Sequence, residues 1–122
     1  MKLEELFEIK GRGVMATADA TGKVNLAVYA RPRVVDEGTV AWGISEGRTW
    51  RNLRENGKAA FLFMSSQGFE GVRLGLELQE MREAGDLLED IRDHAETIVS
   101  HKAAEAVKHV AFFSITEIRA LI

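Results

Sequence analysis

The sequence has 122 residues, a formal net charge of −3, three histidines and no cysteine. This length predicts one domain, spanning 1–122, with a modest core, and the lack of cysteine excludes disulfide bonds, thiolate chemistry and cysteine-ligated metal clusters. The weak negative charge disfavours non-specific nucleic-acid binding, and the chain shows neither a signal-peptide pattern nor a run near the roughly 20 apolar residues of a membrane span. We therefore expect a cytoplasmic protein that binds neither nucleic acid nor membrane.

The first half of the chain predicts a short helix and three strands. Apolar residues recur at helical spacing over 3–7, before two glycines that indicate the end of the helix. Strands are expected at 14–18, 24–35 and 39–44, with turns at 19–22 and 36–38. In the second of these strands, alternate residues from Val24 to Ala30 form an apolar face. Pro32 lacks a backbone donor and therefore indicates an edge or a bend.

The second half predicts two helices and three strands. The expected elements are a helix at 48–55, strands at 58–64 and 72–79, a long helix at 87–99 and a strand at 109–122. The run 58–64 is continuously apolar, which predicts a strand covered on both faces. Asp86 and Glu89 resemble a capping box at the start of the long helix. Because most sequential strands are joined by tight turns, we expect a mainly β, α+β fold with an antiparallel barrel and flanking helices.

One polar segment between two apolar runs is rich in arginine. Arg48, Arg51 and Arg54 recur every three residues in it. If the preceding loop closes just before Arg48, the free N–H groups at the helix start carry a partial positive charge that attracts an anion. Arg48 would bind a phosphate with two N–H groups, and the Thr49 hydroxyl and the Asn52 amide lie close enough along the helix to add donors.

The simpler interpretation of the same segment is a solvated arginine face. Trp50 and Leu53 would then pack into the core, which is the commoner use of large apolar side chains on a short helix. Trp42 shares a strand face with neighbouring apolar residues and is also expected in the core. The residues of the segment are compatible with both interpretations.

Other candidate sites are weaker. His94 and His101 lie seven residues apart, about 10 Å along a helix, which is too far to share one metal ion, so no metal site is expected. Ser65 and Ser66 have no histidine placed near them as a base, which disfavours a hydrolase. His109 is expected to be structural, and the acidic outer face of the helix at 87–99 is expected to be solvated.

The order and spacing of four segments resemble the FMN-binding split barrels related to pyridoxamine 5′-phosphate oxidase, and most closely the small FMN-binding proteins. The segments are Val14-Met15-Ala16-Thr17, Val24-Asn25-Leu26-Ala27, Arg48-Thr49-Trp50-Arg51-Asn52-Leu53 and Asn56-Gly57-Lys58-Ala59. The resemblance covers essentially the whole chain. It implies an antiparallel split β-barrel with FMN as cofactor, and a homodimer with the flavin near the subunit interface.

The resemblance also implies a set of FMN-binding residues. Arg48, Thr49 and Asn52 match the residues that help to hold the FMN phosphate. The further cofactor-binding positions that it implies are Asn25, Leu26 and Ala27, which border the isoalloxazine, and Gly43, Ile44 and Ser45, which lead into the phosphate loop. No catalytic residue is assigned.

The C-terminal segment departs from the pyridoxamine phosphate oxidases. It offers only Arg119, with no histidine after it, so this activity is not expected. The function that remains is an FMN-binding flavoprotein in electron transfer or flavin-dependent reduction, served by a redox partner protein, with the enzyme class left open. The alternative is a non-catalytic binding module for another cofactor, haem or a deazaflavin, on the same barrel. A purely structural dimeric domain is the third interpretation.

Overall fold

A computed structural model describes residues 2–66 and 68–122 of the chain. Within them lie α1 (Leu3–Leu6), β1 (Gly11–Ala18), β2 (Val24–Tyr29), β3 (Arg33–Asp36), β4 (Thr39–Ile44), α2 (Arg48–Glu55), β5 (Lys58–Ser65), β6 (Gly71–Arg82), α3 (Asp86–Ile98), α4 (His101–Ala106) and β7 (His109–Ala120). The predicted helix at 48–55 and the predicted strand at 39–44 are confirmed at both ends. No helix of the described residues is long and apolar enough to cross a membrane.

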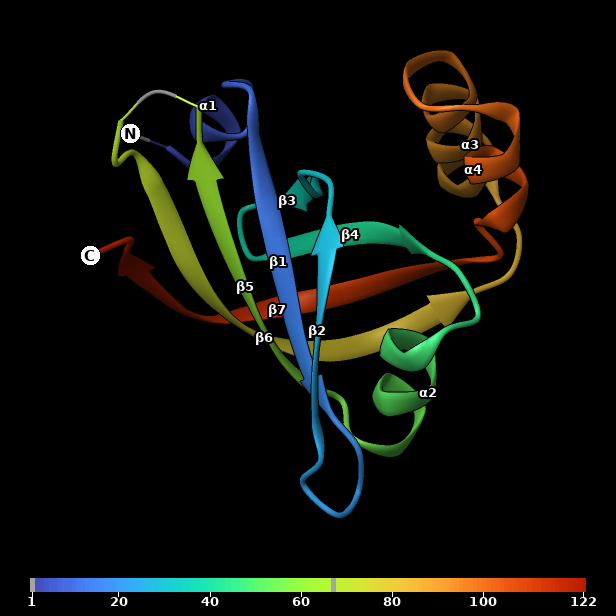
Figure 1. The fold of residues 1–122 in the computed structure, drawn as a ribbon, viewed down its shortest axis with the longest axis horizontal. Helices are drawn as coiled ribbons and strands as arrows, with labels where there is room; N and C mark the ends of the chain where they lie inside the picture. Colours follow the sequence, from blue (N-terminus) through green and yellow to red (C-terminus); the bar gives the residue numbers. More distant parts are fainter. Residues whose placement is uncertain (1, 67) are drawn as a thin grey trace.

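The strands form one curved antiparallel sheet in the described residues, with the order β2-β1-β5-β6-β7-β4-β3. Figure 1 shows the sheet wrapping around the core, with α2 on one side and the α3–α4 pair projecting from another. The two edge strands, β2 and β3, follow each other directly in the chain. Trp42 of β4 donates a hydrogen bond from Nε1 to the Ala30 carbonyl oxygen at 2.8 Å, which ties the connection between the edges to the barrel wall.

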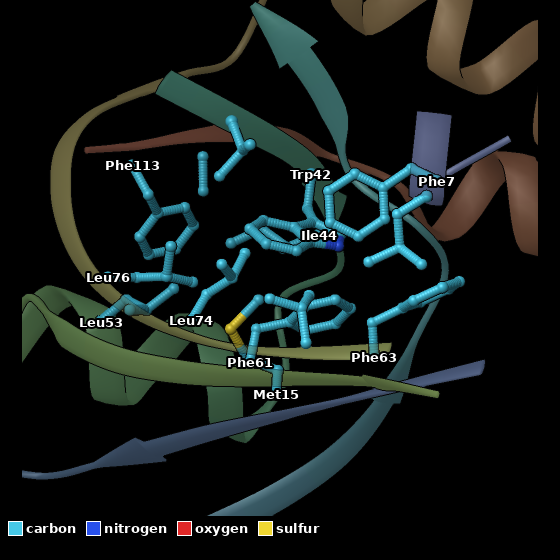
Figure 2. Packing of buried hydrophobic residues seen from close by; sticks show 14 residues of the cluster. Phe7, Met15, Trp42, Ile44, Leu53, Phe61, Phe63, Leu74, Leu76 and Phe113 are labelled. Carbon is cyan, nitrogen blue, oxygen red and sulfur yellow. The ribbon is translucent and has the colours of Figure 1, made fainter. Parts of the chain in front are cut away.

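The barrel encloses an aromatic core (Figure 2). Phe61, Phe63, Phe113 and Met15 are almost fully buried, and the Trp42 ring lies 4.7 Å from that of Phe61. Removal of one such ring typically costs about 3–5 kcal/mol. The expectation that Trp42 belongs to the core is confirmed.

Two strand predictions need correction. The single strand expected at 24–35 is two strands, β2 and β3, because the chain bends at residues 30–32 around Pro32. The predicted bend is therefore present, but it ends the pairing with β1. The strand β5 buries one face within this chain, while Met64 on the other face is 49% exposed, so it is not covered on both faces by the described residues.

The long helix and its cap also differ from the prediction. The N-cap of α3 is Gly85, with φ of 125°, and not Asp86, which lies in the first turn. A positive φ of this size suits glycine, and no side-chain hydrogen bond caps this end of α3 among the described residues. The chain then forms a separate short helix, α4, which begins at His101. Its N-cap is Ser100, whose side chain accepts a hydrogen bond from the Ala103 N–H at 3.0 Å.

The register of β2 turns its apolar residues outward. Met15 of β1 is fully buried and pairs directly with Ala27 of β2, and directly opposed residues point to the same face of a sheet. Val24, Leu26 and Val28 therefore point away from the core, and each is at least 70% exposed. An edge strand with this much exposed apolar surface is suited to contact with another surface.

Candidate functional site

The start of α2 is an uncapped helix end. Gly47 is the N-cap in an extended conformation, and no side chain of the described residues caps the helix. The first helical hydrogen bond of α2 runs from the Arg51 N–H to the Gly47 carbonyl oxygen, at 3.0 Å. The N–H groups of the three residues before Arg51 are the donors that a helix start leaves without internal partners. This end of α2 therefore attracts negative charge.

A cavity of about 240 Å³ lies between α2 and the β1–β2 hairpin. Its polar lining residues are Asp19, Lys23, Asn25, Arg48, Arg51, Asn52 and Glu55. The structure thus brings together three of the predicted site residues, Asn25, Arg48 and Asn52, from two elements that are far apart in the sequence. Lys23 and Arg51 add two cations that were not among the predicted site residues. The spacing of three between Arg48 and Arg51 on a helix was the signal for the second of them.

The two arginines of the cavity are free to bind an anion. Among residues 2–66 and 68–122, neither Arg48 nor Arg51 forms an ion pair within 4.0 Å, although six other arginine and histidine side chains do. Arg54, the third member of the repeat, lies over the Trp50 ring with its guanidinium carbon 4.6 Å from the ring centroid. The repeat therefore divides into two cavity arginines and one that packs on an aromatic ring.

The two carboxylates at the cavity are bound to other donors. Asp19 accepts hydrogen bonds from the Thr21 hydroxyl at 2.7 Å and from the Thr21 and Lys23 N–H groups at 2.9 Å. These bonds, that from the Thr21 hydroxyl first, lower the pKa of the Asp19 carboxyl. Glu55 accepts a hydrogen bond from the Ala20 N–H at 3.3 Å. Asp19 thus stabilises the β1–β2 turn internally, and Glu55 joins this turn to α2.

The Asn52 amide is oriented by the barrel wall. Its Nδ2 donates to the hydroxyl oxygen of Thr17 at 3.1 Å, and Thr17 is 4% exposed in β1. One amide N–H is thereby used, and the rest of the amide stays available to a ligand in the cavity. The role of Thr17 carried no signal in the sequence, because it depends on the contact between α2 and β1.

Thr49 lies on the inner side of α2. It is 5% exposed and does not line the cavity. Burial raises the pKa of the Tyr29 phenol, and a hydrogen bond with Thr49 partly opposes that rise, so Tyr29 stays neutral at ordinary pH. Thr49 can reach a ligand at the helix start through its backbone N–H, whereas its hydroxyl contacts Tyr29.

The other predicted site residues do not line this cavity. Ala27 is half-buried in β2, and Leu26 lies on the outer face, where it lines a second, more apolar groove of about 550 Å³ with Val14 and Ala16. Ile44 is in the core, and Ser45 is exposed before α2.

Gly43 faces α3. A methyl group at this position would lie 2.6 Å from an Ile91 carbon and 2.8 Å from a Val107 carbon. A larger residue here would therefore displace the Ile91 or Val107 side chain, so close packing of the helices on β4 is a structural reason for glycine at this position.

Two further features of the structure give little support for a binding or metal site. A hollow of about 1180 Å³ lies between α1, residues 69–72 and the end of β7, but it shares no lining residue with α2 and includes exposed Phe69, Ile118 and Ile122. In the part of the chain that the structure describes, no group of three or more histidine, aspartate or glutamate side chains is arranged to hold a metal ion. His101 instead pairs with two glutamates of α3 and α4.

Comparison with known proteins relates the chain to other proteins through structure. No protein-family model matches the sequence, and no curated protein matches it. An FMN-binding protein from Syntrophomonas wolfei has a similar structure with a TM-score of 0.83 and 21% identity, over 99% of this chain and 84% of that protein. A putative pyridoxamine 5′-phosphate oxidase from Lactobacillus delbrueckii gives a TM-score of 0.70 and 18% identity, over 98% of this chain and 90% of the other.

A third similar structure comes from a protein with a different ligand. HutZ, a haem storage protein from Vibrio cholerae, gives a TM-score of 0.60 and 18% identity, over 98% of this chain and 95% of that protein. Identities at this level establish the fold and leave the ligand of this chain open. The predicted antiparallel split β-barrel with flanking helices is confirmed, and the chain has the fold of the FMN-binding split barrels related to pyridoxamine 5′-phosphate oxidase.

Proposed function

We propose that this chain is an FMN-binding flavoprotein that acts in electron transfer or in flavin-dependent reduction. The observation that carries the proposal is the cavity at the start of α2, where Arg48 and Arg51 have no ion-pair partner in the described residues and face Asn25 and Asn52. Two free guanidinium groups beside an uncapped helix start match the charge and the hydrogen-bonding needs of a phosphate monoester. The bound flavin would supply the redox chemistry, and the chain would bind and orient it.

The site fits a ligand whose terminal phosphate lies in the cavity and whose remaining part extends along β2. Asn25 of β2 is on the cavity, and the exposed Leu26 beside it lines the outer apolar groove. A ligand with an anionic end and a large flat apolar ring system would therefore satisfy both surfaces. FMN combines these two features, whereas riboflavin lacks the anionic end.

We also propose that the chain forms a homodimer, with the flavin near the interface. The support is the exposed apolar strip of Val24, Leu26 and Val28 on edge strand β2, which continues into the outer groove on β1, β5 and β6. Monomeric proteins rarely leave a continuous apolar surface of this kind in water. A second copy of the chain would cover the strip and shield the ring system from solvent.

Haem and a deazaflavin are the alternative ligands on this barrel. Haem iron needs an axial ligand, for which histidine is the usual choice. None of the three histidines lines the cavity: His109 is 4% exposed and hydrogen-bonded, and His94 and His101 are exposed on the α3–α4 pair. These positions favour a flavin over haem at the arginine cavity.

The first experiment is the absorption spectrum of freshly purified protein, with mass analysis of any released chromophore. Two bands near those of free flavin, with FMN as the released mass, support the proposal. Colourless protein is next titrated with FMN and with riboflavin, and tighter binding of FMN again supports it. A Soret band with released haem, a deazaflavin mass, or no binding of added FMN would reject FMN as the cofactor.

A further inference from the structure

The carboxylate nearest to Arg48 in the sequence is that of Glu46. Only Gly47 separates the two residues, so their Cα atoms are at most about 7 Å apart, within reach of two long side chains. The Glu46 side chain is 51% exposed, and Arg48 is exposed as well. A free carboxylate at this position would also be attracted by the uncapped start of α2. Glu46 is therefore the natural internal competitor for any anion that binds there.

In the structure, the Glu46 carboxylate binds His109 and not Arg48. Its Oε2 lies 2.9 Å from Nε2 of His109, which is 4% exposed. The imidazole ring stacks on Trp50, with ring centroids 5.2 Å apart and planes inclined by 21°. On its other nitrogen, Nδ1, the nearest acid is Glu83 at 3.9 Å.

The sheet and the stack on Trp50 restrain the His109 ring in the position that binds Glu46. His109 begins β7 and pairs with Ile44 of β4, two residues before Glu46. The sheet therefore fixes the backbone on both sides of the hydrogen bond, and the stack on Trp50 fixes the ring. Burial makes the loss of the Glu46 partner costly for the imidazole, because a buried donor without an acceptor is destabilised.

We infer that His109 is a positioning residue that holds the Glu46 carboxylate away from Arg48 and so keeps the anion site open. This inference rests on the proposed function. The same arrangement holds for the two acids that line the cavity, since Asp19 is bound within its turn and Glu55 by the Ala20 N–H. Each of these three carboxylates thus has a donor other than the cavity arginines.

The test compares two variants of the exposed residue, Glu46→Asp and Glu46→Gln. Aspartate keeps the charge but is one methylene too short to keep the bond to His109, whereas glutamine keeps the length and removes the charge. We expect Glu46→Asp to weaken FMN binding by roughly two- to fivefold, the range of an exposed ion pair, and Glu46→Gln to leave it unchanged or slightly tighter. Riboflavin binding, measured by the same fluorescence titration, should not change in either variant.

A rescue experiment separates positioning from folding. His109→Leu, which is similar in size but has no hydrogen-bond donor for Glu46, should weaken FMN binding by a similar factor. The double variant His109→Leu with Glu46→Gln should return FMN binding to the wild-type value. Equal FMN affinities of the two Glu46 variants, or a double variant as weak as His109→Leu alone, would overturn the inference while leaving FMN binding by the wild type intact. A wild-type protein that binds no FMN would overturn the proposed function, and the inference with it.

Discussion

Replacement of Arg48 by alanine tests the anion site most directly. The side chain is exposed and forms no ion pair with any described residue, and α2 stays anchored by buried Thr49 and Leu53. The fold should therefore lose little stability, and the effect should fall on the ligand. A hydrogen bond to a charged group contributes about 1.5–3 kcal/mol, so FMN affinity should fall by about 10- to 150-fold. Riboflavin affinity should stay the same, because riboflavin has no phosphate.

The assay is a fluorescence titration of the flavin-free protein with FMN and with riboflavin in parallel. Arg54→Ala is the matched control, because Arg54 is on the same helix and packs on Trp50 without lining the cavity. We expect this control to bind both flavins as the wild type does. Equal losses of FMN and riboflavin affinity in Arg48→Ala, or equal losses of FMN affinity in the two arginine variants, would refute the phosphate assignment.

Four further outcomes follow from the same geometry. Asn25→Ala should change the spectrum or the reduction potential of the bound flavin more than the arginine substitution does; the reverse order would argue against a ring on β2. Leu26→Lys places a charge in the exposed apolar strip and should convert a dimer to a monomer in sedimentation experiments, whereas an unchanged mass would place the interface elsewhere. Leu53→Ala should lower the free energy of unfolding by about 2–5 kcal/mol in chemical denaturation, because Leu53 is 2% exposed; a much smaller loss would mean that α2 is loosely packed. The pKa of His101 is raised, chiefly by its hydrogen bond to Glu96. The contribution of this pair to the free energy of unfolding is therefore fully present below the pKa of the unfolded chain and is lost as the pH rises through the folded-state pKa. An NMR titration midpoint at or below that of an ordinary histidine would contradict this.

The elements of the fold were largely readable from local pattern. The helix at 48–55 forms where it was predicted, between the N-cap Gly47 and the extended C-cap Asn56. The break near Pro32 was signalled as a bend, but a local pattern cannot say whether a bend ends the pairing. That depends on β3 pairing with β4, a contact set by the curvature of the whole sheet.

The direction of a strand face could not be read from the sequence. Alternation shows that Val24, Leu26 and Val28 share a face, but it does not say whether that face is inside. The pairing of Met15 with Ala27 decides the question only together with the burial of Met15, and which face of the hairpin the barrel buries is a non-local property. An apolar alternation on an edge strand is therefore as consistent with an outer contact surface as with a core.

The candidate site shows the same division between local and non-local information. The sequence identified the groups that can bind an anion, since arginines and a helix start are local features. It could not show which of them are free, because Glu46 and Glu55 lie in the same segment and offer partners of opposite charge. Glu46 is bound by His109, 63 residues away, and Glu55 by the Ala20 N–H, 35 residues away. Whether Glu46 and Glu55 pair with the cavity arginines thus depends on long-range contacts, and substitutions at His109 should alter anion binding although that residue does not line the cavity.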